Sequence, residues 1–462
     1  MLKSESEIAR HLFRWTKEMS YADYYERALT NGVLGIQRGR DHGVMLYLMP
    51  LCPGCSKVKS SRGWGRKFDD LFCCQGTGIE SFSKLADSIY FEEEGKAPVL
   101  YIIQYISSSL NWKSGKIFIS QTVKPVASWD SHLQVTFTIS SNEKVASQSS
   151  TLNLRIPSWS QANGVKATLN GQGLAQPTPG KFLTVTRQWN SGDKIVLELP
   201  LSLRTEAIKD SRPQYAPIQA IFYGPTLLAA MTSKDWKLKS GKAKSLSEWI
   251  TPIPQAHHSN LITLSQGSGN STYALSHINR NIKMTMFPLP RTDWSVRATF
   301  RLILKDSAAS PKQVAPKDAI GKMVMLEPFE FPGSVVVHQG VDGNLIVGVL
   351  GSQNAIFQLV PGLNGKPRTV SLESGSQKGC FVHCGVNGAK YSAVRTIKLR
   401  CQSAGAPPDA GFKEAVSFAL NNGVSSYHPI SFVAKGARRN FLLTPFNNFM
   451  DESYTVYFNI TS

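Results

Sequence analysis

Apolar residues in the first 95 positions recur at the spacing of amphipathic α-helices. A loop that contains Gly, Pro and four Cys residues, over 50–78, separates two such series. The pattern therefore predicts helices on both sides of a cysteine-bearing loop. The two apolar series comprise Ile8, Leu12, Trp15, Met19, Ala22 and Leu29, and then Ile79, Phe82, Leu85, Ala86 and Ile89.

The pattern changes to strict alternation of apolar and polar residues after about residue 96. Alternation at period two, interrupted by turns such as Asn170-Gly171, is typical of half-buried antiparallel strands. We therefore predict a β-sandwich over residues 96–232. The clearest alternating runs contain Leu133, Val135, Phe137 and Ile139, then Leu152, Leu154 and Ile156, and then Ile195, Leu197 and Leu199.

The next segment, over 233–320, is predicted to be a linker followed by a small β region. Its first part, over 233–245, is rich in Lys and Ser, and strand-like runs follow over 246–305. The polar stretch over 306–320 contains two prolines and suggests a second boundary.

Residues 321–462 contain internal repeats, which predict a β-trefoil of three all-β units of about 45–50 residues each. Val337-His-Gln-Gly340 recurs as Val382-His-Cys-Gly385, and Val433-Ala-Lys-Gly436 is a looser third copy. Modules of this kind bind ligands in shallow pockets, one per repeat. The alternative is that the repeats only build the core. The whole chain is thus expected to be a multidomain, mainly β protein that begins with helices.

The composition is strongly basic, with 51 Lys and Arg, 32 Asp and Glu, a net charge of +19 and a pI near 9.6. This charge suggests a nucleic-acid partner, but the sequence has no zinc-finger, helix-turn-helix or RNA-recognition motif. We therefore expect a solvated basic surface or an acidic polysaccharide partner, and no nucleic acid. No stretch approaches about 18 apolar residues, so no membrane span is expected. The first residues lack the apolar region of a signal peptide.

The cysteines are the clearest chemical feature of the chain. Seven are present, and Cys52, Cys55, Cys73 and Cys74 fall close together. An odd, clustered set is not typical of a disulfide framework. A helix follows the Cys73-Cys74 pair, with Thr77 as its expected N-cap, so these thiols should have lowered pKa values. The four residues together also suggest a zinc site of four thiolates, and the alternative is that they are small buried apolar residues.

Several long motifs resemble the plant branch of the family 127 glycoside hydrolases, whose activity is β-L-arabinofuranosidase. The resemblance extends over essentially the whole chain, because its last 140 or so residues resemble the arabinose-binding β-trefoil of α-L-arabinofuranosidases. The motifs are Arg10-His-Leu-Phe-Arg-Trp15, Tyr21-Ala-Asp-Tyr-Tyr-Glu-Arg-Ala-Leu-Thr-Asn-Gly32, Gly63-Trp-Gly65, Cys73-Cys-Gln-Gly-Thr-Gly-Ile-Glu80, Ile221-Phe-Tyr-Gly-Pro-Thr-Leu227, Phe357-Gln-Leu-Val-Pro-Gly-Leu363 and Tyr427-His-Pro-Ile-Ser-Phe-Val-Ala-Lys-Gly436.

The resemblance implies an (α/α)6 catalytic barrel, of which residues 1–95 would be the C-terminal remnant. It also implies zinc held by one Glu and three Cys, with Cys73 as nucleophile and ligand and Cys74 as a second ligand. A glycosyl-thioether intermediate followed by attack of water would retain configuration. The remaining ligands and the acid/base Glu are expected upstream of Arg10, where this sequence has no Glu-x-Cys.

The trefoil resemblance implies sugar contacts at His338 and His383, and at Asn354, which stands near an acidic position of the family. The third repeat carries Ala434 in place of the histidine. Arabinose-containing polysaccharides or glycoprotein glycans are therefore the expected partners.

We expect a glycoside hydrolase-family chain whose catalysis is lost, because half of the zinc site and the acid are expected upstream of Met1. The zinc site is thus expected to be incomplete, and the alternative is a purely structural zinc site in which Cys52 and Cys55 supply replacement ligands. The alternatives are an active enzyme, a non-catalytic arabinan-binding protein and a non-functional gene fragment. The full-length family is expected in the extracellular space or cell wall.

Overall fold

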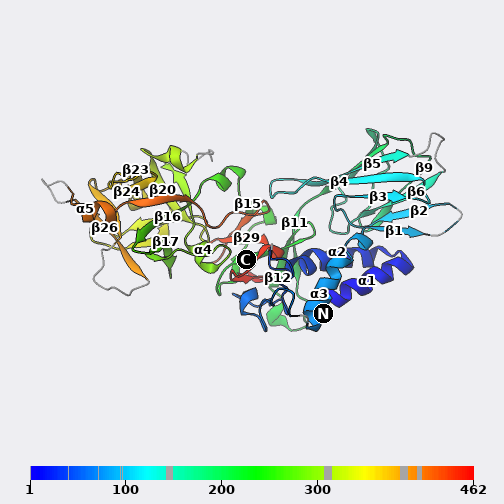
Figure 1. The fold of residues 1–462 in the computed structure, drawn as a ribbon. Coiled ribbons are helices and arrows are strands. Elements are labelled where there is room, and N and C mark those ends of the chain that lie inside the picture. The colour runs from blue at the N-terminus through cyan, green and yellow to red at the C-terminus, as the bar shows by residue number, and fades with distance from the viewer. Residues whose placement is uncertain are drawn as a thin grey trace. The chain divides into compact units, whose positions relative to one another are not determined.

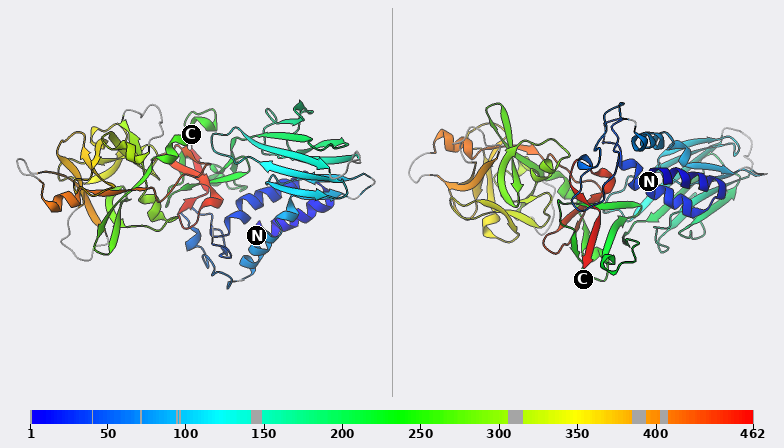
Figure 2. Two further views of the ribbon diagram at one scale, coloured as in Figure 1. Left: turned by 45° about the horizontal axis from the view of Figure 1, so that its top comes forward. Right: turned by 90° about the horizontal axis from the view of Figure 1, so that it is seen from below.

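The computed structural model describes residues 2–461 apart from residues 40, 71, 94, 96, 142–148, 306–314, 385–393 and 403–407. The chain is a multidomain, mainly β protein that divides into two compact units (Figures 1 and 2). Part of the predicted boundary over 306–320 lies outside the described residues. Unit 1 is Met1–Ala229, Pro445–Phe449 and Val456–Asn459, and unit 2 is Ala230–Thr444, Met450–Thr455 and Ile460–Ser462.

Unit 1 begins with α-helices on both sides of the cysteine-bearing loop, as the sequence predicted. They are α1 (Leu2–Thr16), α2 (Met19–Asn31) and α3 (Cys73–Ser83), and α1 and α2 lie alongside the strands of this unit (Figure 2). Within the described residues, no helix combines the length and the apolar character that crossing a membrane requires.

The buried face of α1 differs from the predicted one. Ile8 and Trp15 belong to the apolar series, yet they are 57% and 73% exposed, whereas Ala9 and Phe13 are buried. Phe13 packs edge-on against Phe91, with 5.0 Å between the ring centroids. Apolar residues occupy more than one side of α1, and the contacts with its neighbours select the side of Ala9 and Phe13. The exposed apolar side chains leave α1 with an uncovered surface.

A β-sandwich follows the helices and confirms the predicted fold class. Apolar residues of both its sheets, among them Leu154 and Phe137, form one buried core. The four-stranded sheet has the order β1 (Tyr90–Glu93), β2 (Val99–Ile102), β6 (Ser150–Ile156) and β9 (Lys181–Arg187). The six-stranded sheet has the order β3 (Ser108–Trp112), β4 (Ile117–Val123), β5 (His132–Ser141), β10 (Lys194–Pro200), β7 (Lys166–Leu169) and β8 (Gln172–Gly173).

The sandwich sheets end at Pro200, earlier than the predicted residue 232. The next strands, β11 (Leu203–Ala207), β12 (Ile218–Tyr223) and β13 (Thr226–Met231), pair with one another instead. The last strand, β31 (Tyr457–Thr461), also returns to β12, where Tyr457 pairs with Ala220.

A buried lysine fixes a second returning segment, Pro445–Phe449, within unit 1. The Nζ atom of Lys57 donates hydrogen bonds to the carbonyl oxygens of Gly35 at 2.8 Å and Phe449 at 2.7 Å. The same ammonium lies 5.4 Å from the centroid of the Phe446 ring. Carbonyl dipoles and an aromatic face thus solvate a charge that water does not reach.

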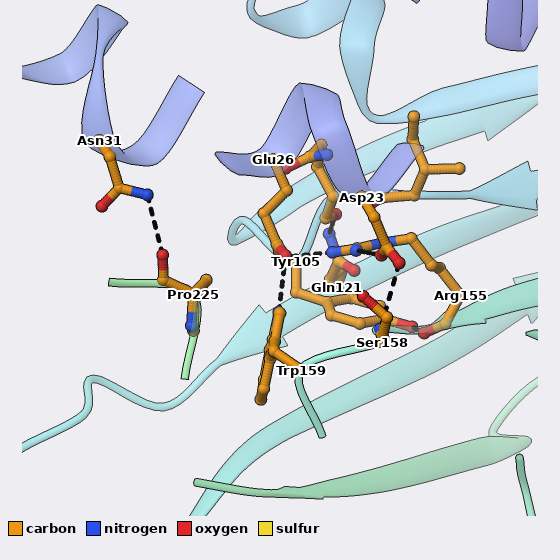
Figure 3. A network of polar contacts seen from close by, with 11 residues as sticks. Asp23, Glu26, Asn31, Tyr105, Gln121, Arg155, Ser158, Trp159 and Pro225 are labelled. Carbon is orange, nitrogen blue, oxygen red and sulfur yellow. Dashed lines mark hydrogen bonds and ion pairs between the residues drawn. The ribbon is translucent and has the colours of Figure 1, made fainter. Parts of the chain in front are cut away.

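Arg155 on β6 joins the sandwich to α2 (Figure 3). Its side chain is fully buried, and its guanidinium pairs with Asp23 at 2.6 Å and with Glu26. Its Nε atom donates to the carbonyl of Ile103 at 2.6 Å. The Trp159 indole donates to Glu26 at 2.7 Å. Each charge in this buried cluster therefore has an opposite charge or a hydrogen-bond partner.

Unit 2 contains a twelve-stranded arrangement that forms the β-trefoil. Its strands fall into three consecutive groups of four, and the second and third strands of each group form a hairpin, namely β17–β18, β21–β22 and β25–β26. The groups are β16 (Leu261–Ser268), β17 (Ser271–Ile278), β18 (Asn281–Met286) and β19 (Phe300–Leu304); β20 (Met323–Pro328), β21 (Ser334–His338), β22 (Leu345–Val349) and β23 (Phe357–Pro361); and β24 (Thr369–Ser374), β25 (Cys380–Cys384), β26 (Arg395–Cys401) and β27 (Phe418–Asn422).

The trefoil strands therefore extend over 261–422, which differs from the predicted 321–462. The first repeat lies in the segment taken for a small β region, and the proposed third copy around Val433 is not a trefoil repeat. Val433 lies on β28 (Phe432–Ala434), which pairs with β15 (Ile250–Pro252) outside the twelve strands. The other elements of unit 2 are β14 (Lys237–Lys239), β15 (Ile250–Pro252), α4 (Asp293–Arg297), α5 (Ala410–Ala415), β28 (Phe432–Ala434), β29 (Phe441–Pro445) and β30 (Tyr454–Thr455).

We predict that Arg155→Met lowers the free energy of unfolding of unit 1 by about 3–5 kcal/mol, because Asp23 and Glu26 lose their buried partner. Urea unfolding followed by near-UV circular dichroism measures the change. Arg212→Met is the control, because Arg212 pairs with Asp210 at 2.7 Å on the surface, and it should leave the unfolding midpoint unchanged. Equal midpoints for the two variants would contradict the structural role of Arg155.

Candidate functional site

Helix α3 begins at the adjacent cysteines, four residues earlier than the predicted N-cap at Thr77. The residue before the helix is Phe72, and Thr77 lies inside it, where its hydroxyl donates to the Cys73 carbonyl at 2.7 Å. The N-cap prediction was therefore wrong, because Thr77 bonds back to the preceding turn. Cys73 and Cys74 occupy the first turn, where the helix dipole favours a thiolate.

Tyr47 and Arg62 complete the surroundings of the exposed Cys73 thiol. A β-bridge between Leu46 and Trp64 brings the segment that carries Tyr47 next to the segment that carries Arg62. The Tyr47 hydroxyl lies 3.6 Å from Cys73 Sγ. The Arg62 guanidinium lies over the rings of Tyr47 and Phe72, at 5.1 and 4.2 Å from their centroids.

These contacts favour the thiolate form of Cys73. The hydrogen bond from Tyr47 is the largest cause that lowers the pKa of Cys73, and the Cys74 thiol and the Arg62 charge act in the same direction. The same hydrogen bond raises the pKa of the Tyr47 hydroxyl. The arrangement therefore exposes a sulfur nucleophile to solvent and favours its thiolate form.

The two thiols alone do not complete the zinc site that the family resemblance implies. Cys73 Sγ and Cys74 Sγ lie 3.9 Å apart, and sulfur is a suitable zinc ligand. A zinc site requires three or four protein ligands. Among the described residues, no group of three or more His, Cys, Asp or Glu side chains could hold a metal ion.

Disulfides account for four of the seven cysteines, contrary to the expectation from their number. Cys52 pairs with Cys55, and Cys380 pairs with Cys401 across β25 and β26. Cys52 and Cys55 are thus bonded to each other and cannot serve as thiolate ligands. This structure therefore does not bring four thiolates together, and zinc stays an expectation from the family resemblance.

The trefoil brings two of the three predicted sugar-binding residues together. His338, at the end of β21, contacts the hydroxyls of Ser374 at 3.0 Å and Ser376 at 3.3 Å through Nε2. Ser376 in turn donates to the Asn354 side-chain oxygen at 3.1 Å. His338 and Ser374 are buried, and Ser376 is exposed. Burial lowers the pKa of His338 and thereby favours the neutral form of its ring.

His383 occupies the same position on β25 but has different surroundings. Its Nδ1 atom is buried and has no hydrogen-bond partner among the described residues. Its ring lies 5.6 Å from that of Phe412. Burial lowers the pKa of His383, and the nearby Arg400 charge acts in the same direction while Asp409 opposes it. The structure therefore does not join His383 to the cluster around His338.

The first trefoil repeat supplies a third equivalent histidine that sequence reasoning missed. His277 lies near the end of β17, is buried, and approaches the Glu330 carboxylate at 3.6 Å. Its ring packs edge-on against Phe331. Burial, followed by the nearby Arg297 charge, lowers the pKa of His277 to about 3. In the first repeat, the space beside the histidine is thus occupied by the side chains of Glu330 and Phe331.

Tyr47, Arg62, Ser374 and Ser376 were also missed from the sequence. Tyr47 and Arg62 lie in a loop without periodic pattern, so only the bridge between Leu46 and Trp64 reveals their position. His277 had a usable signal, because Ala298-Thr-Phe300 after it matches Ala355-Ile-Phe357 after His338.

Two family models match the N-terminal part of the chain. Residues 4–87 match the model described as the beta-L-arabinofuranosidase GH127 catalytic domain, and residues 99–201 match the GH127 middle domain. These two segments therefore carry GH127 sequence and contain the Cys73-Cys74 pair and most of the sandwich. No curated protein matches the chain.

Similar solved structures include GH127 enzymes. One is a beta-L-arabinofuranosidase from Geobacillus stearothermophilus T6, with 18% identity, a TM-score of 0.39 and coverage of 75% of this chain and 46% of that one. Another GH127 beta-arabinofuranosidase has 14% identity and a TM-score of 0.43, and the match covers 99% of this chain and 48% of that one. The BEL beta-trefoil has 12% identity, a TM-score of 0.23 and coverage of 37% and 97%. The chain thus spans about half the length of the two GH127 structures, and TM-scores of this size carry no conclusion about chemistry.

We predict that iodoacetamide alkylates Cys73 in the native protein well before Cys384. Cys73 is exposed, whereas Cys384 is buried and burial raises the pKa of its thiol. Peptide mass spectrometry after timed quenching measures the two rates. Unfolding in urea is the control, because it should make both sites react at similar rates. Equal rates in the native protein would contradict this description.

Proposed function

We propose that this chain binds L-arabinofuranose-containing glycans and does not hydrolyse them by itself. The proposal starts from the matches to the GH127 catalytic-domain and middle-domain models over residues 4–87 and 99–201. The observation that carries the binding proposal is the cluster of His338, Ser374, Ser376 and Asn354. The identity of the sugar follows from the description of the matching family.

The His338 cluster has the chemistry of a site for sugar hydroxyls. A neutral imidazole, two hydroxyls and an amide offer both donors and acceptors. His338 and Ser374 are buried at its base, while Ser376 is exposed and Asn354 is half-buried. A sugar ring that contacts Ser376 and Asn354 would exchange its hydrogen bonds with water for bonds to groups already held in place.

The surroundings of Cys73 support the second part of the proposal. Retaining hydrolysis needs a nucleophile and a carboxylic acid that protonates the leaving oxygen. The nearest polar partner of Cys73 is the phenol of Tyr47, whose raised pKa makes it a weak acid. Asp69 and Asp70, the two carboxylates just before α3, pair with Arg66.

Hydrolysis is the second candidate function, and the lowered pKa of the exposed Cys73 thiol favours it. Sγ of Cys73 would attack the anomeric carbon while the glycosidic bond breaks and an acid protonates the leaving oxygen. Water would then cleave the thioglycoside and regenerate the thiol. This route requires an acid that the described residues around Cys73 do not provide. The two cysteines would also require further ligands to hold zinc.

We also propose an oxidising location such as the extracellular space or cell wall. Structural disulfides persist in oxidising compartments and are rare in the cytosol. The cross-strand bond between Cys380 and Cys401 in the trefoil supports this location.

The binding proposal predicts that the full chain is retarded by arabinan in affinity electrophoresis. His338→Ala should weaken the retardation, because it removes the ring that orders both serine hydroxyls. His42→Ala is the matched control, because His42 is exposed in the loop before Tyr47, and it should behave like the parent. No retardation of the parent chain, or equal loss in both variants, would reject arabinan binding through this cluster.

The second prediction is that the purified full chain releases no arabinose from methyl β-L-arabinofuranoside, whose leaving oxygen must be protonated, with or without added zinc. The expected result is a rate equal to that of Cys73→Ser, because no acid assists the leaving group. Release that Cys73→Ser abolishes would overturn the proposal of inactivity and favour the enzyme. A cooperative urea-unfolding transition of the same preparation, followed by near-UV circular dichroism, shows that the chain is folded.

A further inference from the structure

A cleft of about 520 Å³ lies within unit 1, between α2, the segment over 158–161 and β11. This volume falls within the range of about 300–1,000 Å³ that is usual for small-molecule sites. Its lining is rich in hydroxyl, carboxylate and guanidinium groups and includes Trp159. The lining contains neither Cys73 nor any trefoil residue, so the cleft is separate from both sites described above.

The charges around this cleft balance one another. Its lining contains the carboxylates of Asp23, Glu26 and Glu206 and the guanidiniums of Arg27 and Arg204. The third carboxylate charge is matched by Arg155, which is outside the lining and pairs with Asp23 and Glu26 (Figure 3). A cleft with many polar groups and no net charge favours a neutral polar ligand over an anion or a cation.

The polar groups are held in place before any ligand binds. Glu206 pairs with Arg27 at 2.6 Å and with Arg204 at 3.0 Å. Both guanidiniums lie over the Phe222 ring, at 4.7 and 4.5 Å from its centroid. An ionised carboxylate accepts about four hydrogen bonds and a guanidinium donates five, so both groups retain capacity for a ligand. This fixed geometry lowers the entropic cost of binding.

Two residues of the segment over 158–161, Trp159 and Ser160, line the cleft. Ser160 is 5% exposed, and its hydroxyl has no hydrogen-bond partner among the described residues. A buried, unsatisfied hydroxyl is unfavourable unless a ligand completes it. Trp159 is fixed by its hydrogen bond to Glu26 at 2.7 Å (Figure 3), which leaves its apolar ring beside these polar groups.

We propose that this cleft is a second saccharide-binding site, which takes a neutral sugar residue of a glycan. Balanced donors and acceptors match sugar hydroxyls, and an aromatic ring matches the apolar face of a sugar. The inference goes beyond the proposed function, because it assigns recognition to unit 1 independently of the trefoil.

The test uses the full chain with His338→Ala and His383→Ala, so that the trefoil positions do not contribute. Arabinotriose and galactotriose are the neutral probes, trigalacturonate is the charged probe, and isothermal titration and saturation-transfer NMR measure binding. We expect one or both neutral probes to bind and trigalacturonate to bind at least tenfold more weakly. Failure of both neutral probes, or equal binding of trigalacturonate, would overturn the proposal.

Ser160→Ala separates a binding role from a structural one. The substitution removes an unsatisfied buried hydroxyl, so the unfolding midpoint should stay the same or rise, whereas the affinity for the neutral probe should fall about threefold to tenfold. A fall in stability without a fall in affinity would place Ser160 in the fold alone and reject its part in the site.

Arg27→Met provides a second variant with a matched control. Arg27 and Arg212 each pair with a carboxylate and lie over an aromatic ring, but Arg212 lies outside the cleft lining. Arg27→Met should weaken binding at least tenfold, and Arg212→Met should not change it. Equal effects of the two substitutions would overturn the proposal. Arabinan electrophoresis of the parent chain tests the trefoil separately, so failure of either site can be distinguished.

Discussion

The buried guanidinium of Arg155 is the constraint on which the organisation of unit 1 depends. A charge without access to water requires opposite charges nearby, and Asp23 and Glu26 on α2 supply them. The position of α2 against the sandwich is thereby fixed. Tyr25 of the same helix bonds Ser88 at 2.5 Å and packs in a cluster with Phe82 of α3. The helix that carries Cys73 is thus held in place through α2, although Arg155 lies far from it in the sequence.

The same ion cluster explains how a structural network can also form the wall of a cleft. Asp23 and Glu26 face Arg155 on one side and line the cleft on the other. Their charges are compensated from within the protein, so a ligand is not required to neutralise them. The lining can therefore present acceptors without attracting cations. Ser160 differs from these groups, because the described residues leave its buried hydroxyl unsatisfied.

Sequence pattern predicted strands of the sandwich well where one face of the strand is buried. Phe137 and Ile139 of β5 lie in the shared core, and Thr138 between them is exposed. The pattern failed for α1, where Ile8 and Trp15 share helical spacing with buried residues but remain exposed. Helical spacing shows that an apolar face exists, but the partner decides which face is covered. The cysteine site was predicted only in part for the same reason. Cys73 is recognisable in a motif. Tyr47 contacts it because a β-bridge joins two segments that are distant in the sequence.

The trefoil shows why short similarities locate repeats less well than strand pairing. Val433 matches a motif of four residues, but β28 pairs with β15 and lies outside the twelve strands. The true first repeat has no such motif and is defined by the β17–β18 hairpin, which places His277 where His338 and His383 stand in the later repeats. The three histidines at this backbone position contact different neighbours. His277 lies beside Glu330 and Phe331, His338 beside Ser374 and Ser376, and His383 beside Phe412. The scaffold fixes where the imidazole stands, and the adjoining loop decides whether a ligand can reach it. Ser376 is exposed and its hydroxyl contacts His338. Among the described residues, the second repeat is therefore the one whose histidine contacts a hydroxyl on the surface.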